Sequence, residues 1–289
     1  MSELDGVKAL TILAGKGDLP LRVAEAAKAA GVKVHIIALQ GFGDTGLLND
    51  YQPNVISMGE VGKAFKLIRK AGSTHVCMAG GVDRPDIKRL RMDFEAARHL
   101  PKVMRAAAKG DGALLDFVRD LMQSKGLKII SPSKIVGELT TDAGMFGALT
   151  PDESARADIE KGVAVARALG AFDVAQGAVV CDGLVLAVEA AEGTDAMLAR
   201  VATLSSDLRG HEGALRGVLV KVTKPAQDRQ IDQPTIGPAT ILNAHKAGLA
   251  GVAIEAEHGL IVDREETIAT ADRLGLFIFG LDIADYEQA

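Results

Sequence analysis

The segment Lys8-Ala-Leu-Thr-Ile-Leu-Ala-Gly-Lys-Gly-Asp-Leu-Pro20 determines the fold class predicted for the first half of the chain. Its apolar run ends in a glycine turn, and Pro20 then suits the first turn of a helix that continues to Gly31. A second apolar run, Val32–Leu39, follows this helix directly. A strand, a helix and another strand in this order indicate a βαβ unit with parallel strands.

The same alternation continues to about residue 130. Further apolar runs predict strands at Asn54–Met58, His75–Ala79 and Lys128–Ile130. A helix is predicted at Val61–Ala71, and residues 86–125 predict two helices separated at Gly110-Asp-Gly112. Right-handed crossovers join such strands into a doubly wound sheet. We therefore predict an α/β protein with a Rossmann-like, parallel-sheet N-terminal domain over residues 1–138.

The second half of the chain has a different rhythm. The polar, glycine-containing stretch 139–152 predicts a linker. Beyond it, an Asp-Gly pair between apolar runs within Ala178–Glu189 predicts a hairpin of antiparallel strands. Further strands are predicted at Gly217–Val222, Gly251–Ile254 and Leu276–Phe279. Helices are predicted at Pro151–Gly170, Asp195–Leu204, Ala239–Ala247 and Asp263–Leu274. Residues 153–289 thus predict a mixed α/β C-terminal domain.

Composition excludes several classes of protein. The chain has 289 residues, and its net charge of -5 argues against general binding to nucleic acid, which requires a basic surface. Cys77 and Cys181 lie in separate apolar runs and predict buried free thiols in a reducing compartment. The acidic N-terminus does not resemble a signal peptide, and no run has the length of a transmembrane helix. We expect a cytoplasmic protein.

Two glycine-rich turns are candidates for a ligand pocket in the first domain. Gly15-Lys-Gly-Asp-Leu-Pro20 and Ala79-Gly-Gly-Val82 both follow predicted strands, so they belong to the same carboxyl edge of the sheet. Glycine lets backbone approach a ligand there, and a helix N-terminus favours phosphate. The third glycine of the dinucleotide fingerprint is missing. Tight structural packing of the two turns is the alternative interpretation.

Carboxylates gather in Ala187-Val-Glu-Ala-Ala-Glu-Gly-Thr-Asp195. Oxygen ligands near a strand end suit Mg²⁺. The simpler alternative is that Thr194 caps a helix and Asp195 lies in its acidic first turn.

The segment from Lys221 to Gly237 mixes lysines, an arginine and aspartates with Pro225 and Pro234. The prolines make it a poor helix or central strand, so it is predicted to be a long loop, and such loops are often functional. A solvated surface loop is the alternative. The chain has no His-Glu-x-x-His pattern and no Gly-x-Ser-x-Gly elbow, which disfavours zinc and serine hydrolases.

Taken together and in this order, the four motifs resemble those of bacterial UDP-2,3-diacylglucosamine pyrophosphatases of the non-calcineurin type. The resemblance implies Mg²⁺-dependent hydrolysis, or Mn²⁺ in its place, of a diacylated UDP-sugar to UMP and the lipid product 2,3-diacylglucosamine 1-phosphate, in lipid A biosynthesis. It also implies two domains with a substrate cleft between them, a homodimer, and peripheral contact with the cytoplasmic face of the inner membrane.

The resemblance also assigns site residues. Asp228 and Asp232 match the two aspartates of the family motif, while Gln230 stands where many members have arginine. The implied catalytic group is Asp228, Asp232, Lys221, Lys224 and Gln227. The implied metal ligands are Asp228, Glu192, Asp195 and Glu189. Substrate contacts are expected from Gly15, Gly17, Leu19, Pro20, Gly80, Gly81, Thr194, Arg229 and Thr235.

Two other functions stay open on the residues alone. One is a nucleotide-dependent oxidoreductase that uses the first domain, and the other is a non-catalytic protein that binds a nucleotide sugar or a lipid. Binding of NAD(P) without pyrophosphatase activity would favour the former. Stoichiometric binding of the substrate without UMP release would favour the latter.

Overall fold

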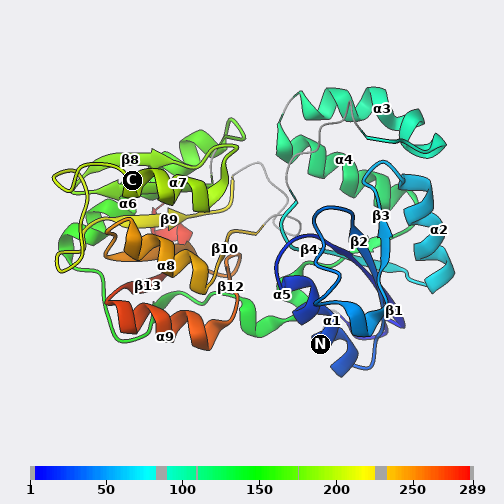
Figure 1. Ribbon diagram of the computed structural model, residues 1–289, viewed down its shortest axis with the longest axis horizontal. Coiled ribbons are helices and arrows are strands. Elements are labelled where there is room, and N and C mark those ends of the chain that lie inside the picture. Colours follow the sequence, from blue (N-terminus) through cyan, green and yellow to red (C-terminus); the bar gives the residue numbers. More distant parts are fainter. Residues whose placement is uncertain (1–3, 83–89, 109, 175, 225–232, 287–289) are drawn as a thin grey trace. The chain divides into compact units, whose positions relative to one another are not determined.

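The computed structural model describes residues 4–82, 90–108, 110–174, 176–224 and 233–286. The chain divides into two compact units, Met1–Gly137 and Glu138–Ala289, and each has its own central sheet (Figure 1). The first sheet is parallel and the second is mixed, so the predicted α/β fold class is confirmed.

The sheet of the first unit has the order β3-β2-β1-β4-β5, with every adjacent pair parallel. Its strands are β1 (Ala9–Ala14), β2 (Lys33–Leu39), β3 (Asn54–Ile56), β4 (His75–Ala79) and β5 (Lys128–Ile129). The chain moves from β1 outward to β3 and then returns to β4 on the other side of β1. The direction of winding therefore reverses between β1 and β4, and ligands of doubly wound sheets bind outside the carboxyl ends of strands at such a point.

Helices cover both faces of this sheet. They are α1 (Leu19–Ala29), α2 (Val61–Ala71), α3 (Phe94–Ala107), α4 (Asp111–Ser124) and α5 (Pro132–Ile135), with a 3-10 turn η1 (Asn49–Tyr51). Because right-handed crossovers that run in opposite directions lie on opposite faces, α1 and α2 cover different sides. Phe65 of α2 and Met122 of α4 share one buried cluster with Ile37 of β2. The outer helix α3 packs on α4 and α2 (Figure 1).

The second unit has a six-stranded sheet of order β6-β13-β11-β9-β7-β8. Its strands are β6 (Gly144–Phe146), β7 (Gly177–Cys181), β8 (Leu184–Val188), β9 (Val218–Lys221), β11 (Gly251–Glu255) and β13 (Phe277–Leu281). The three central strands β9, β11 and β13 are parallel, whereas β6 and β7 run antiparallel to their neighbours. Two short strands, β10 (Thr235–Ile236) and β12 (Leu260–Ile261), form a separate parallel pair.

Alternation along the central strand β9 sorts the core into two layers. Val218 and Val220 pack in one cluster with Ile159 and Val163 of the long helix, whereas Leu219 packs in a second cluster on the opposite face. The helices of this unit are α6 (Glu153–Gly170), α7 (Gly193–Ala202), α8 (Pro238–Lys246) and α9 (Arg264–Leu274), with 3-10 turns η3 (Gly137–Leu139) and η4 (Ile283–Tyr286). Side chains of a strand point to alternate faces, so Lys221 shares the face of Leu219.

The predicted hairpin of β7 and β8 is present. Asp182 and Gly183 at its turn both have positive φ, 49° and 75°, which a two-residue turn of this kind requires. The carboxylate of buried Asp158 in α6 accepts hydrogen bonds from the backbone N–H groups of both turn residues, at 2.9 and 2.7 Å. The helix therefore fixes the hairpin turn.

The stretch 139–152 is not simply the linker that the sequence predicts. Its residues Gly144–Phe146 form β6, which pairs antiparallel with β13 at the edge of the second sheet. The two paired strands are more than 130 residues apart in the chain, so no local sequence pattern predicts their pairing.

Among the residues that the structure describes, no helix combines the length and apolar character needed to cross a bilayer.

Candidate active site

Lys221 lies at the carboxyl end of β9 and is 5% exposed. Strand alternation directs its side chain to the face covered by α7, away from the face that α6 covers. A buried ammonium group is costly unless it is hydrogen-bonded and balanced by negative charge. The contacts of Lys221 satisfy this requirement.

A chain of hydrogen bonds connects Lys221 to a buried carboxylate. The Lys221 ammonium group donates to Thr194 Oγ1 at 2.7 Å and to the backbone carbonyl of Thr235 at 3.3 Å. The Thr194 hydroxyl then donates to Glu189 Oε1 at 2.8 Å. The hydroxyl accepts from the cation and donates to the anion, so each partner takes its preferred role. Three elements, β9, α7 and the end of β8, are thereby joined at one edge of the sheet.

Glu189 is 8% exposed and stands directly after β8. Its backbone N–H donates to the carbonyl of Gly177 at 2.8 Å, and its Oε2 faces the Cα of the same glycine, where a Cβ would lie 2.5 Å away. Oε2 has no hydrogen-bond partner within the described part of the chain. A glycine at position 177 therefore provides the space that this carboxylate occupies.

Glu255 is a second buried carboxylate at the same edge, and the sequence interpretation did not single it out. It ends β11, is 3% exposed, and accepts a hydrogen bond of 2.6 Å from the backbone N–H of Thr223. Thr223 lies two residues after Lys221, just before the segment 225–232. An acidic residue that closes an otherwise apolar run, Gly251–Glu255, is the local signal that could have indicated it.

Lys224 is held by an ion pair. Its ammonium group lies 2.7 Å from Asp173 Oδ1, with the two side chains 11% and 21% exposed. The role in the catalytic group that the resemblance implies for Lys224 would require its ammonium group to leave this pair. Asp173 adopts a left-handed backbone conformation, φ 58°, at the end of α6, so the long helix supplies the counter-charge.

The acidic motif around α7 does not form a cluster. The carboxylate of Glu192 lies 2.8 Å from Arg200, and this hydrogen bond lowers the pKa of Glu192 below its usual value. Asp195 accepts a hydrogen bond of 2.9 Å from Asn243 of α8. No group of three or more potential metal-ligating side chains occurs in the described residues. Glu189, Glu192 and Asp195 are thus not brought together, and as a set they do not fit a metal ion.

Thr194 does not cap α7, in contrast to the simpler interpretation of the motif. Glu192 is the N-cap residue and makes no side-chain capping bond, while the Thr194 hydroxyl belongs to the chain of hydrogen bonds between Lys221 and Glu189. Asp195 does lie in the acidic first turn, as expected. The predicted residues Gln227, Asp228, Arg229 and Asp232 lie outside the described residues.

The two glycine-rich turns of the first unit meet each other. Backbone N–H groups of Gly15 and Lys16 donate to the carbonyls of Ala79 and Gly81, both at 2.8 Å. A Cβ on Gly15 would lie 2.5 Å from the Gly81 oxygen, and Gly80 has φ +89°. The two backbones therefore approach too closely to leave room for side chains at Gly15 and Gly80. This is the tight structural packing that was the alternative to a ligand pocket. Because the turns flank the point where the winding reverses, this packing also shapes the predicted substrate edge.

The other predicted substrate contacts of this unit follow the first turn. Gly17 has φ +84° with open space around its Cα, and Leu19 and Pro20 begin α1. Pro20 is buried, so its ring serves the core as well as the helix start.

Cysteine chemistry is disfavoured at both thiols. Cys77 and Cys181 are free and buried, as predicted. Burial raises the pKa of Cys77 and raises that of Cys181 to about 11. Neither thiol is therefore a nucleophile at neutral pH, since the thiolate is the reactive form.

These features define an α/β protein of two units, a Rossmann-like one and a mixed one with buried charged residues at its strand ends. The chain belongs to the LpxI family. The family model described as the LpxI N-terminal domain matches residues 9–139, and that described as the LpxI C-terminal domain matches residues 142–279.

A curated relative supports the same membership. The chain is 46% identical over 276 residues to "UDP-2,3-diacylglucosamine pyrophosphatase LpxI" of Caulobacter vibrioides, covering 96% of this chain and 98% of that protein. Among solved structures, the UDP-glucose 4-epimerase of Thermus thermophilus in complex with NAD has 13% sequence identity and a TM-score of 0.29, over 94% of this chain and 85% of that one. That score is too low to bear on fold or function.

Proposed function

We propose that the chain hydrolyses the pyrophosphate bond of UDP-2,3-diacylglucosamine, giving UMP and 2,3-diacylglucosamine 1-phosphate, a step of lipid A biosynthesis. The observation that carries the proposal is the 46% identity, over nearly the full length of both chains, to a pyrophosphatase of that name. Water supplies the new P–O bond, the bridging P–O bond breaks, and one phosphate leaves with the bridging oxygen. No covalent enzyme intermediate is needed, which agrees with the inert thiols.

The reaction needs a positioned water molecule and cations that stabilise developing negative charge. We assign the water-orienting role to Asp228, with Asp232 beside it in the same sequence segment. Gln227, Arg229, Thr235 and Lys224 are the proposed substrate contacts, and Lys224 must exchange Asp173 for a phosphate to act. Lys221 we assign to positioning, because its buried ammonium group is committed to Thr194 and Thr235.

Mg²⁺ or Mn²⁺ is part of the proposal, with a set of ligands that differs from the one the resemblance implied. Glu192 and Asp195 are engaged with Arg200 and Asn243. Glu189 is engaged with Thr194 and, through it, with Lys221. We therefore keep Asp228 as a proposed ligand and add Asp232 from the same segment. A bound divalent cation would supply positive charge to neutralise the pyrophosphate oxygens.

The proposed substrate carries two acyl chains, so the enzyme must reach it at a membrane surface. We propose a cytoplasmic homodimer that contacts the inner membrane peripherally. Sedimentation equilibrium tests the dimer, and cell fractionation tests the location.

Incubation of the full chain with detergent-dispersed UDP-2,3-diacylglucosamine tests the function. We expect UMP and the lipid monophosphate in equal amounts with Mg²⁺, and loss of both products with excess chelator. Stoichiometric binding without UMP release would indicate the non-catalytic carrier instead. Activity that survives complete chelation would remove the metal from the proposal while leaving the hydrolysis.

A further inference from the structure

The outer face of α3 carries an exposed apolar stripe, which we define as Phe94, Ala97, Pro101 and Met104. These residues are spaced three, four and three apart, so they follow one side of the helix. All four are exposed, Phe94 by 84% and Met104 by 45%. An aromatic ring this exposed on a helix costs solubility without adding to the core, so the stripe requires a physical reason.

A basic stripe runs beside the apolar one. It consists of Arg98, Lys102 and Arg105, spaced four and three apart and all exposed. The chain as a whole has a net charge of -5, so this concentration of positive charge runs against the overall balance. Lys102 and Arg105 also line an open cavity of about 270 Å³, together with Ala106 and with Ala113 of α4.

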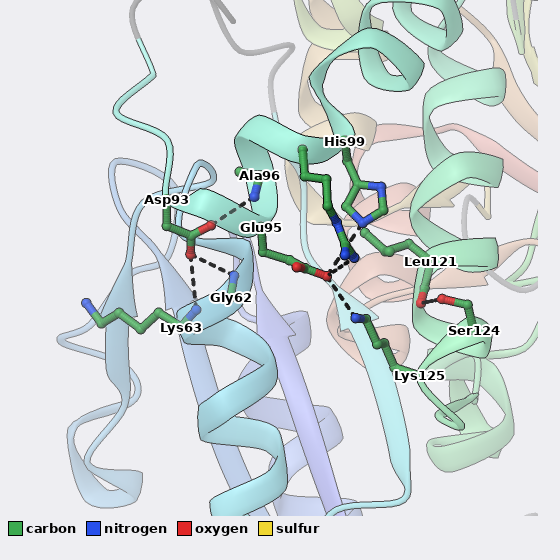
Figure 2. A network of polar contacts seen from close by, with 10 residues as sticks. Gly62, Lys63, Asp93, Glu95, Ala96, His99, Leu121, Ser124 and Lys125 are labelled. Atoms are coloured by element: carbon green, nitrogen blue, oxygen red, sulfur yellow. Dashed lines mark hydrogen bonds and ion pairs between the residues drawn. The ribbon is translucent and has the colours of Figure 1, made fainter.

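Acidic side chains at this helix point inward (Figure 2). Glu95 is the one acidic residue within α3, and its carboxylate binds Lys125 at 2.8 Å and Arg98 at 2.9 Å. Asp93, just before the helix, accepts from Ala96 N at 2.9 Å and from Gly62 N of α2 at 2.7 Å. These contacts anchor α3 on its neighbours. Arg98 shares the Glu95 carboxylate with Lys125, so the positive charge of the basic stripe rests mainly on Lys102 and Arg105.

We propose that α3 docks on an anionic phospholipid bilayer, with the apolar stripe at the acyl boundary and the basic stripe at the lipid phosphates. Paired apolar and basic stripes are the pattern of helices that lie in a membrane interface. Charge complementarity selects lipid over a second copy of this chain. A symmetric pairing of α3 with itself would bring two basic stripes close without an acidic partner on that face.

This inference rests on the proposed function, because an enzyme whose substrate carries two acyl chains must reach them in a membrane. It adds the surface through which the contact is made. The helix lies on the outside of the first unit, packed on α2 and α4 (Figure 1).

Vesicle co-sedimentation of the full chain tests the proposal. The wild-type chain should bind vesicles of phosphatidylethanolamine and phosphatidylglycerol, bind pure phosphatidylcholine weakly, and be released by high salt. Lys102→Gln/Arg105→Gln should weaken binding roughly 25-fold, at about fivefold for each cation removed. Phe94→Ser should weaken it about tenfold.

Matched control variants test whether the loss of vesicle binding is specific to substitutions in α3. Lys8→Gln/Lys33→Gln removes the same charge from exposed lysines at the amino ends of β1 and β2. Phe172→Ser removes a phenylalanine that is 78% exposed in the second unit. Both should bind like wild type. Equal loss in these controls, or wild-type binding by the α3 variants, would overturn the assignment to α3.

Two further measurements distinguish docking on lipid from substrate binding and from self-association. Hydrolysis of detergent-dispersed substrate should be unchanged in the α3 variants, whereas a parallel loss would mean that α3 binds substrate instead. Sedimentation of the variants should match wild type, and dissociation of a dimer by Phe94→Ser would identify the stripe as a subunit interface. If the wild-type chain binds vesicles but releases no UMP from dispersed substrate, the proposed function fails while the docking surface stands.

Discussion

The ammonium group of Lys221 donates a hydrogen bond of 2.7 Å to the hydroxyl oxygen of Thr194. Because this hydroxyl donates to Glu189 in turn, a buried cation and a buried anion are linked through one side chain. Removal of either charge leaves the other inside the protein without compensation. The energetic consequences of single and paired substitutions therefore differ in a way that can be measured.

Lys221→Met should destabilise the second unit by about 3–5 kcal/mol, the usual cost of leaving one member of a buried charged pair uncompensated. Adding Glu189→Gln to this variant should recover a large part of the loss, because no charge then remains buried. Urea unfolding of the wild-type chain, the two single variants and the double variant measures the difference. Strictly additive losses in the double variant would show that the two charges are energetically independent.

Thr194→Val should lower the free energy of unfolding by about 1–3 kcal/mol, since valine keeps the shape but leaves the ammonium group and Glu189 Oε1 each short of a partner. Thr194→Ser retains the hydroxyl and should cost well under half as much. If positioning of Lys221 matters for turnover, kcat should follow the same order. Equal losses for Val and Ser would mean that packing of the methyl group, not the hydroxyl, is what Thr194 contributes.

Alanine substitutions at three glycines of the first unit distinguish backbone strain at positive φ from steric contact of the added Cβ. Gly17→Ala adds backbone strain alone, at φ +84° with open space around it, and should cost about 1–2 kcal/mol. Gly15→Ala adds contact with the Gly81 carbonyl, and Gly80→Ala combines strain at φ +89° with contact on the Lys16 carbonyl. We expect Gly80→Ala to be the most destabilising in thermal unfolding. The same order in substrate affinity would show that the turns form part of the binding edge.

Sequence patterns were sufficient for the fold where the determinant is local. The hairpin at Asp182-Gly183 follows from residues that tolerate positive φ, and the βαβ units follow from alternating apolar runs. The edge strand β6 could not be predicted in this way. It has three residues, and its partner β13 lies far along the chain, so its pairing depends on tertiary packing.

The candidate site also combines features that the local sequence predicts with features that depend on tertiary packing. Glu189, Glu192 and Asp195 lie around a turn, as the motif predicted, but closeness in sequence did not bring their side chains together. Glu189 belongs to the strand end and Asp195 to a helix that turns about 100° per residue, so their side chains diverge to Thr194 and Asn243. The interior position of Lys221 was available from strand alternation, which puts it on the same face as Leu219.

His35 predicts a pH dependence of stability. Its ring Nδ1 lies 3.3 Å from Thr11 Oγ1, which donates to Ser73, so Nδ1 carries the proton; Nε2 then accepts from the Asn54 amide at 3.1 Å. Burial, assisted by Lys33, lowers the pKa of His35 below 6.5. The unfolded chain therefore takes up a proton at higher pH than the folded chain. This contribution to stability is complete above pH 6.5 and is lost as the pH falls through 6.5 toward the lower folded pKa.

His35→Gln removes this titration. The decline in the free energy of unfolding between about pH 7 and pH 5 should be shallower in the variant than in the wild-type chain. Urea unfolding at several pH values provides the comparison. A steeper or unchanged decline in the variant would show that His35 does not carry the effect.

Asp228 is the proposed water-orienting residue, and its substitution tests the chemistry most directly. Asp228→Asn keeps size and hydrogen-bonding atoms but removes the charge, so kcat for UMP release should fall by about 10²–10⁴-fold. The KM of the substrate should change much less, because binding depends mainly on other groups. Circular dichroism and unfolding free energy should match wild type, as should those of the control Asp207→Asn, an exposed aspartate in the same unit. Turnover near the wild-type rate would remove Asp228 from the reaction and return the segment 225–232 to the role of a surface loop.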